Sequence, residues 1–473
     1  MFAGTKALVM GIGLHGGGVA TTKWLAKHGA RVTATDQRTE KILAPSRKAL
    51  RSTKVNFVLG THRKEDFEQN DLIVVNPGVP RESEYLAVAR KAGKRIENDA
   101  SLFFRFTDNP VIAVTGTRGK TTTTLWIADL LKKKYPDARP SGNTPENAFL
   151  KEFARVKGKN IPVVAEMSSW QLEYLPVSGR APHVAVITNL YPDHLNRYRD
   201  MGDYADAKAN IFHDQRGDDF LVLNHNNPWT AYFLKKHPGS IVFFISMKAL
   251  PKGKNGLFVR GEHLIFRFDG IEQKLFGVAR FIKERGVHNL ENLLCAVLAI
   301  KLFDPEVVIT EKDILRLPAP RMREEVVLKK GRLTIVNDSC ATSPDGVEAA
   351  LRRFAKEGNI ILVTGGTDKE LEFTSLAVTI KKYIPKRQLV LLEGSATKKL
   401  IAELVKLKYF KGSAQEIYSD LSSCVDAALA STKILKGKTT ILFSPGAASF
   451  EKFLHEFDRG EKFDYLVRNM LKK

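Results

Sequence analysis

The chain of 473 residues is long enough for about three domains of average size, each with its own core. Apolar residues make up 43% and charged residues 27%, which is typical of globular proteins and excludes a disordered or collagen-like chain. The formal net charge is +22, from 74 Lys and Arg against 52 Asp and Glu. Because the basic residues are scattered, surface lysines without a partner or anionic nucleotide-type substrates explain this charge better than nucleic acid does.

Several features point to a soluble protein of the cytoplasm. The longest apolar run, 293–300, is far shorter than the roughly 18 residues of a membrane span, so no span is expected. The N-terminal apolar run is broken by glycines and lacks a small-residue cleavage site. Cys295, Cys340 and Cys424 are odd in number and far apart, which predicts neither disulfides nor a zinc site.

Short β-branched runs alternate with helical patterns along the whole chain, as in parallel βαβ units. The first stretch opens with a strand at 6–10 and ends at a turn over 107–110. A new strand at 111–115 opens the second stretch, which ends at the hinge PAP, 318–320. The third contains the strand-like runs RLTIVND, NIILVTGG, QLVLLEG and TTILFSPG. We therefore predict an α/β protein with three domains, 1–108, 109–318 and 319–473.

The first strand leads into a glycine-rich turn, Gly11-Ile12-Gly13-Leu14-His15-Gly16, and Asp36 follows at the end of the next strand. Such glycines allow close approach to a phosphate at a helix N-terminus, and the acid can bind a ribose hydroxyl. The same glycines could serve only to pack helix against strand. The pattern alone predicts a Rossmann-like domain and does not identify a nucleotide.

The second domain begins with a strand, the loop Gly116-Thr117-Arg118-Gly119-Lys120-Thr121, and a helix through Leu130. Backbone amides of this kind of loop hold phosphates, the lysine reaches the outer phosphates, and the hydroxyl binds Mg²⁺. The position of the first glycine of a standard phosphate loop is Val114, so this is a shortened variant. We predict a P-loop ATPase-like central domain with a mainly parallel sheet.

Further polar residues follow that loop along the chain. Glu166 comes at the end of a buried strand pattern, where a carboxylate is costly unless it binds a cation. Taken singly, His194 could be an ordinary loop histidine and Lys208 a surface lysine. Asn289 and Asn292 lie three apart on one face of a helix start, where caps would explain them. Their order behind the phosphate loop favours a functional interpretation.

This order of motifs resembles the Mur ligase superfamily over essentially the whole chain, and within it the members that add glutamate. The motifs are VVNPGVP, GTRGKTT, SGNTP, EMSSWQLE, TNLYPDHLNRY, YADAK, HNLEN, RMREEV, NDSCATSP, VTGGTDKE and SPGAASFEKFLHEFDRGEKF. The resemblance implies an ATP-dependent amide ligase that adds D-glutamate to UDP-N-acetylmuramoyl-L-alanine through an acyl phosphate. It also implies a Rossmann-like third domain for the amino acid, and we expect a cytoplasmic monomer.

By this resemblance, each group of site residues has a role. The UDP-substrate would contact Leu14, His15, Gln37, Arg38, Gly78, Asn143 and His194. ATP would contact Gly116, Thr117, Arg118, Gly119, Lys120, Thr121, Asn289, Asn292, Arg323 and Asp338. Two Mg²⁺ ions would be held by Thr121, Glu166, His194 and a carbamylated Lys208. The catalytic residues would be Lys120, His194 and Lys208, and D-glutamate would contact Thr342, Lys369 and Ser449.

Some positions depart from the family pattern, and two of them bear on the chemistry. Arg118 replaces an asparagine and adds a cation beside the triphosphate, while Cys340 stands where a lysine is usual near the acyl site. Because a thiol cannot replace an ammonium group, a related ligase that adds another amino acid is the first alternative. A nucleotide-binding oxidoreductase and a non-catalytic binding protein of the same fold are the alternatives from other classes.

Overall fold

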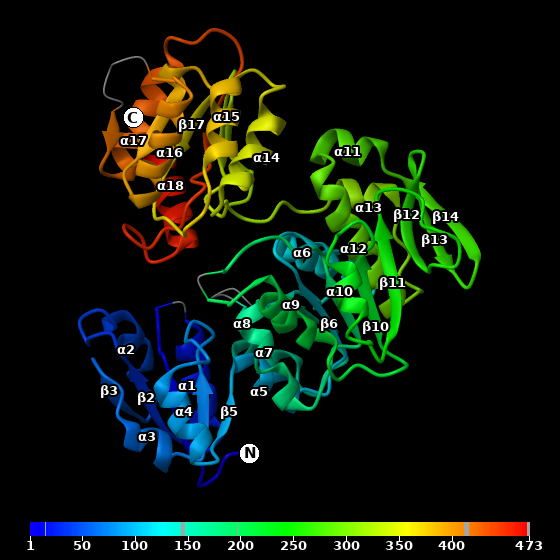
Figure 1. Ribbon diagram of the computed structural model, residues 1–473, viewed down its shortest axis with the longest axis vertical. Helices are drawn as coiled ribbons and strands as arrows, with labels where there is room; N and C mark the ends of the chain where they lie inside the picture. Colours follow the sequence, from blue (N-terminus) through cyan, green and yellow to red (C-terminus); the bar gives the residue numbers. More distant parts are fainter. Residues whose placement is uncertain (15, 143–146, 196, 411–415, 471–473) are drawn as a thin grey trace. The chain divides into compact units, whose positions relative to one another are not determined.

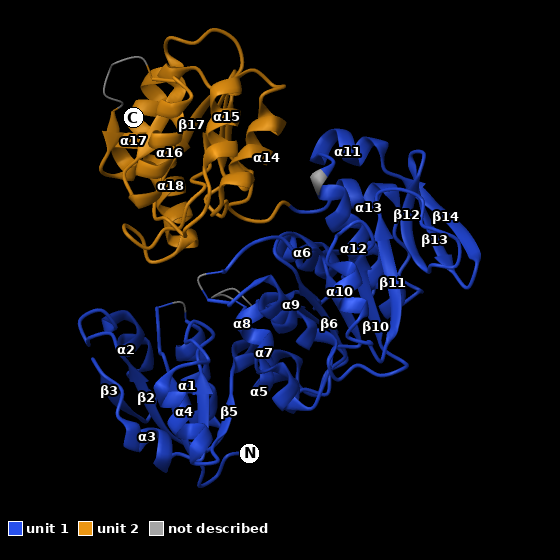
Figure 2. Ribbon diagram, viewed as in Figure 1, with its two compact units in different colours: residues 1–318 blue, residues 319–473 orange. Residues whose placement is uncertain are grey.

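A computed structural model describes residues 1–14, 16–142, 147–195, 197–410 and 416–470. It divides into two compact units, 1–318 and 319–473, shown in Figure 2. The predicted boundary after residue 108 lies inside the first unit and stays a prediction. None of the helices in the described ranges is long and apolar enough to cross a membrane.

The N-terminal sheet has five parallel strands in the order β3-β2-β1-β4-β5. Helices follow the strands in the alternating pattern that the sequence predicts (Figure 1). Because β1 pairs with β2 on one side and β4 on the other, the loops after β1 and β4 meet at the point where strand order reverses. The elements are β1 Lys6–Met10, α1 Gly17–Lys27, β2 Arg31–Asp36, α2 Ala44–Leu50, β3 Val55–Leu59, α3 Lys64–Gln69, β4 Leu72–Val75, α4 Glu84–Lys91, β5 Arg95–Glu97 and α5 Asp99–Phe106.

The central sheet has nine strands in the order β14-β13-β12-β11-β10-β9-β6-β8-β7. Its fully buried central strands β6, β8 and β9 are parallel, while β12, β13 and β14 form antiparallel hairpins at one edge. The strands are β6 Val111–Thr115, β7 Pro140–Gly142, β8 Val163–Glu166, β9 Val184–Ile187, β10 Phe220–Asn224, β11 Ile241–Ser246, β12 Gly256–Arg260, β13 His263–Phe268 and β14 Ile271–Gly277. The helices are α6 Lys120–Leu131, α7 Phe149–Val156, α8 Ser169–Leu172, α9 Met201–Ala209, α10 Thr230–Leu234, α11 Ala279–Arg285, α12 His288–Phe303 and α13 Glu311–Leu315, with 3-10 turns at Leu175–Ser178 and Asn210–Phe212.

The second unit holds a six-stranded sheet in the order β15-β16-β20-β17-β18-β19, parallel except for the β15–β16 hairpin. All four strand-like runs predicted in this part of the chain are present, as β16, β17, β18 and β20. The elements are β15 Glu325–Lys330, β16 Leu333–Asn337, α14 Pro344–Phe354, β17 Asn359–Thr364, α15 Thr374–Tyr383, β18 Leu389–Leu392, α16 Ser395–Lys406, β19 Ile417–Tyr418, α17 Leu421–Thr432, β20 Thr439–Phe443 and α18 Glu456–Met470, with a 3-10 turn at Lys386–Gln388.

The predicted α/β architecture is confirmed, with three sheets that are mostly parallel. Apolar strand residues and the inward faces of the helices form separate cores, one on each side of the central sheet and one on each side of the third. Many of the polar residues singled out from the sequence, such as Glu166, Asp36 and Asp338, lie at or just beyond the carboxyl ends of parallel strands, the edge where open α/β sheets bind ligands. Lys208, Asn289 and Asn292 lie on helices instead, and Arg323 precedes β15.

Candidate active site

The phosphate-type loop lies between β6 and α6, as the sequence predicts. Gly116 has φ of 146° and Gly119 has φ of 80°, a region that side-chain-bearing residues rarely occupy. A Cβ atom on Gly116 would collide with Thr188, and one on Gly119 would collide with Asn292 of α12. The two glycines therefore let the loop pack tightly between β9 and α12 and leave backbone amides at the helix N-terminus for an anion.

The loop that follows β9 supports this arrangement. The Asn189 side chain accepts a hydrogen bond from the Arg118 amide at 2.9 Å, and the Thr188 hydroxyl donates to the Arg118 carbonyl at 2.6 Å. The Thr117 hydroxyl accepts from the Tyr191 amide at 3.0 Å. The segment TNLYPDH, which stood out in the sequence for His194, thus also shapes the phosphate-type loop.

Lys120 and Lys208 converge on a single backbone oxygen. The Lys120 amine donates to the carbonyls of Gly116 and Thr117, both at 3.1 Å, and the Lys208 amine donates to the Gly116 carbonyl at 2.9 Å. Lys208 belongs to α9, far from the loop in sequence. The structure therefore brings together two of the three residues that we predict to be catalytic.

Lys208 is buried, with 1% of its surface exposed, so the surface-lysine interpretation is wrong. Burial lowers the pKa of its amine well below the ordinary value, the nearby Lys120 charge lowers it further, and Asp193 opposes the shift. Its amine also lies 4.6 Å from the centroid of the Tyr204 ring. A neutral amine is a nucleophile, so this environment suits covalent modification of Lys208 better than an ordinary salt bridge.

Glu166 ends β8 beside β6, and its side chain is nearly buried at 5% exposure. His194 follows β9 with φ of 56°, and its backbone amide donates to the Asp193 carboxylate at 2.9 Å. Thr121 is the second residue of α6. Among the described residues, no group of three or more His, Cys, Asp or Glu residues could hold a metal ion.

Asn289 and Asn292 lie on one face of α12, as predicted. The Asn292 side-chain amide donates to the Asn289 side-chain oxygen at 3.2 Å, and Asn289 donates to the Arg285 carbonyl at 2.9 Å. Since Asn292 also abuts Gly119, this face of α12 lies directly beside the phosphate-type loop.

The predicted UDP contacts surround the strand-order reversal of the first sheet. Leu14 lies in the loop after β1, Gln37 and Arg38 are exposed after β2, and Gly78 lies in the loop after β4. His15 and Asn143, which belong to the same prediction, lie outside the described residues. The Asp36 carboxylate accepts hydrogen bonds from the Gly13 and Arg38 amides at 3.0 and 2.9 Å, so it shapes the glycine-rich loop itself.

In the second unit the three predicted amino-acid contacts come from loops after β16, β17 and β20, which are neighbours in the sheet. The Lys369 amine donates to the Thr342 hydroxyl at 3.3 Å. Paired backbone bonds between Thr367 and Ala448 join the loop of Lys369 to the loop of Ser449. The buried Ser449 hydroxyl has no hydrogen-bond partner in the described chain.

Arg323 is exposed before β15, and Asp338 is buried just after β16. The Asp338 carboxylate accepts from the Ser444 hydroxyl at 2.6 Å and from the Glu324 amide at 3.0 Å. Burial, helped by the Glu324 charge, raises the pKa of Asp338 to about 7. The same burial raises the pKa of the Cys340 thiol to about 12, so this position carries no charge in place of the usual lysine.

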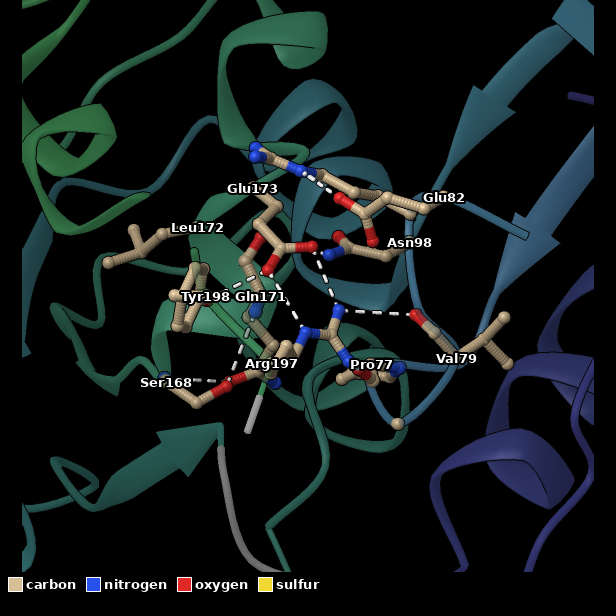
Figure 3. A network of polar contacts seen from close by, with 12 residues as sticks. Pro77, Val79, Glu82, Asn98, Ser168, Gln171, Leu172, Glu173, Arg197 and Tyr198 are labelled. Atoms are coloured by element: carbon tan, nitrogen blue, oxygen red, sulfur yellow. Dashed lines mark hydrogen bonds and ion pairs between the residues drawn. The ribbon is translucent and has the colours of Figure 1, made fainter. Parts of the chain in front are cut away.

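Sequence reasoning missed the contacts of two arginines, the buried Arg459 and the half-buried Arg197. Arg459 donates to Ser339 O at 2.7 Å and to Ala447 O and Ala448 O at 3.0 and 3.1 Å, which ties together the loops after β16 and β20. Arg197 is held by Glu173 and by the loop after β4 (Figure 3). Both arginines lie within motifs that carry the family resemblance, but an arginine in a polar segment normally predicts a solvated side chain, so the motifs did not indicate these contacts.

Three family models match consecutive parts of the chain. The N-terminal domain of MurD-like Mur ligases matches residues 5–97, the Mur ligase middle domain matches 114–300, and the glutamate ligase domain of Mur ligases matches 322–446. The order of these matches is the order of the three sheets.

Relatives and solved structures agree with the family models. A UDP-N-acetylmuramoylalanine--D-glutamate ligase of Roseiflexus sp. (strain RS-1) is 36% identical over 99% of both chains. One from Borreliella burgdorferi (strain ATCC 35210 / DSM 4680 / CIP 102532 / B31) is 34% identical over 98% of this chain and 97% of the relative. A structure of MurF from Acinetobacter baumannii, at 13% identity, covers 99% of this chain and 94% of its own with a TM-score of 0.57, which shows a shared fold. The chain belongs to the Mur ligase family, and its similar relatives are the D-glutamate ligases within it.

Proposed function

We propose that the chain is an ATP-dependent ligase that joins D-glutamate to UDP-N-acetylmuramoyl-L-alanine, a step in the synthesis of peptidoglycan precursors. The observation that carries the proposal is the convergence of Lys120 and Lys208 on the Gly116 carbonyl, just after β6, while the buried Glu166 ends the neighbouring strand β8. The relatives named as D-glutamate ligases align over nearly the whole chain, which supports D-glutamate as the amino acid.

The residues around the phosphate-type loop fit ATP. The glycines at 116 and 119 let the loop pack against Thr188 and Asn292, where a Cβ atom would collide, and the N-terminus of α6 at the end of this loop favours an anion. Lys120 and Thr121 would serve the phosphates together with Gly116, Thr117, Arg118 and Gly119. Asn289, Asn292, Arg323 and Asp338 would hold the rest of the nucleotide.

Lys208 would carry a carbamate in the active enzyme. Its buried neutral amine can attack CO₂, which forms a C–N bond and releases a proton, and this converts a poorly solvated amine into an anionic oxygen ligand. Thr121, Glu166, His194 and the modified Lys208 would then hold two Mg²⁺ ions. When bound, these ions neutralise charge on the phosphate oxygens.

The remaining predicted residues would bind the UDP-linked substrate and D-glutamate. Leu14, His15, Gln37, Arg38 and Gly78 would contact the UDP group, while Asn143 and His194 would contact the sugar-peptide end. Lys369, with Thr342 and the unpartnered Ser449 hydroxyl, would bind the carboxylates of D-glutamate. A diamino acid would bring a second ammonium group towards Lys369, which disfavours it.

The two steps of amide formation explain why cationic groups are needed around the phosphates. The terminal carboxylate of the UDP-linked substrate is a poor electrophile until it has attacked the γ-phosphate and become an acyl phosphate. The D-glutamate amine then displaces phosphate and an amide forms. Negative charge accumulates on oxygen in both steps, and Lys120 would stabilise it by electrostatic attraction.

The test is incubation of the purified chain with ATP, Mg²⁺, UDP-N-acetylmuramoyl-L-alanine and D-glutamate, followed by mass measurement of the nucleotide-sugar product. Formation of one amide and one ADP per turnover supports the proposal. ATP hydrolysis without amide formation would contradict it. We also propose that the enzyme acts as a monomer in the cytoplasm, where both ATP and UDP-linked precursors are supplied.

A further inference from the structure

The Arg197 side chain is the centre of a network that joins the first sheet to the central one (Figure 3). Its two terminal nitrogens donate to the carbonyls of Pro77 and Val79, both at 3.1 Å. Its guanidinium group also donates to both oxygens of the Glu173 carboxylate, at 3.3 and 2.9 Å. One side chain thus holds two backbone carbonyls and one carboxylate in a fixed arrangement.

The carbonyls that Arg197 holds flank Gly78, in the loop after β4. This loop is braced internally, since the amides of Gly78 and Val79 donate to the side chain and the backbone of Asn76 at 3.1 and 2.9 Å. Arg197 therefore does not create the shape of the loop. It fixes where the loop lies relative to the chain segment from which Arg197 itself comes.

That segment carries His194. The backbone amide of Arg197 donates to the His194 carbonyl at 2.9 Å, so the two residues share one turn. The Trp170 ring contacts both side chains, with its centroid 4.7 Å from the Arg197 guanidinium carbon and 5.2 Å from the His194 ring centroid. Arg197 and Trp170 together set the place of His194 with respect to the loop of Gly78.

The charged side chains of this network are largely buried. The side chain of Arg197 is 10% exposed and that of Glu173 is 2% exposed, and the Tyr198 hydroxyl donates to Glu173 at 2.8 Å. Buried ion pairs contribute little net stability, because desolvation offsets their attraction. The planar fork of arginine, however, can satisfy several acceptors in one geometry, which a lysine ammonium cannot do.

We infer that Arg197 is a positioning residue that couples the UDP-binding loop around Gly78 to the sugar-peptide end of the site at His194. The inference rests on the proposed function, in which one substrate contacts both places. A ligand that spans both places needs the correct spacing between them, whereas a ligand that reaches only the first sheet does not.

The test compares two ligands in direct calorimetric binding, UDP-N-acetylmuramoyl-L-alanine and UDP alone. Arg197→Lys keeps the charge but cannot hold Glu173 and both carbonyls. We expect this variant to weaken binding of the full substrate about tenfold and binding of UDP less than twofold. In turnover, the KM for the full substrate should rise while the KM for ATP stays within twofold.

The matched control is Arg105→Lys. Arg105 also pairs with a buried carboxylate, Glu97, at 2.8 Å and donates to the Val177 carbonyl, and these contacts do not involve the loop of Gly78. Arg105→Lys should leave the ratio of the affinities for UDP-N-acetylmuramoyl-L-alanine and for UDP unchanged. If Arg197→Lys fails to fold, Glu173→Gln is the second variant, because it keeps the shape of the side chain and weakens the ion pair with Arg197. It should also reduce the affinity for the full substrate relative to that for UDP, by a smaller factor.

If Arg197→Lys loses affinity equally for UDP and for the full substrate, or loses affinity for neither, the inferred coupling is overturned while the ligase assignment stays intact. If the wild-type chain binds neither ligand, the proposed function fails and the coupling fails with it.

Discussion

Lys120 and Lys208 donate to the same carbonyl oxygen, that of Gly116, at 3.1 and 2.9 Å. Two amines of like charge at one acceptor repel each other, and burial adds to the cost for Lys208. The arrangement becomes favourable when Lys208 is neutral or carries an anionic group. This relationship links the phosphate-type loop to the predicted carbamate.

Replacing Lys120 with alanine should abolish ATP turnover and preserve the fold. Loss of an electrostatic stabiliser of this kind costs on the order of 3 to 4 kcal/mol, a decrease in kcat of a hundredfold or more. The measurement is ADP release with all substrates present. Lys132→Ala, an exposed lysine at the end of the same helix, is the control and should keep full activity. Wild-type rates in Lys120→Ala would reject the role assigned to this loop.

Replacing Lys208 with alanine should abolish activity, and short carboxylic acids such as acetate should restore part of it. The reason is that a small carboxylate can take the place of the carbamate as an anionic oxygen ligand. Rates are measured across an acetate series, with Lys120→Ala as the variant that acetate should not rescue. Full activity of Lys208→Ala without any additive would refute the carbamate.

Asp338→Asn should change how stability depends on pH. Because burial raises the pKa of Asp338 to about 7, the folded chain holds a proton there that the unfolded chain has lost above roughly pH 4. This contribution is complete at low pH and is lost as pH rises through 7. The Tm of the wild type relative to Asp338→Asn should therefore fall between pH 5 and pH 8. If the Tm of the wild type relative to Asp338→Asn rises from pH 5 to pH 8, the raised pKa of Asp338 is contradicted.

Lys369→Ala should raise the KM for D-glutamate or lower kcat/KM by about tenfold, the ~1.4 kcal/mol scale of one charge-assisted contact. The KM for ATP should not change, because Lys369 is assigned to the amino-acid site, where its amine donates to Thr342. Lys398→Ala, an exposed lysine of α16, is the matched control. An unchanged KM for D-glutamate in Lys369→Ala would remove this residue from the amino-acid site.

Local patterns predicted the elements that carry the site. The strand before Gly116, the helix after Lys120 and the four strands of the third sheet follow from apolar runs that end in turn residues. The antiparallel hairpins β12 to β14 were not predicted, since a uniform βαβ pattern suggests parallel strands throughout.

Contacts between distant segments were beyond the reach of sequence reasoning. Taken singly, Lys208 looked like a surface lysine, and only the family resemblance marked it as functional, because nothing near it in sequence shows that its amine donates to the Gly116 carbonyl. Glu173 and Arg197 are 24 residues apart, and their pairing depends on how the segments after β8 and β9 meet. The motif order identified the family, whereas the electrostatics of these buried groups came only from the fold.

The most direct test of the account is the release of ADP and phosphate with UDP-N-acetylmuramoyl-L-alanine and a panel of amino acids. The panel holds D-glutamate, L-alanine, glycine and meso-diaminopimelate. The account predicts turnover with D-glutamate well above the others, because Lys369, Thr342 and Ser449 suit an amino acid with two carboxylates. Equal rates with D-glutamate and L-alanine would contradict it.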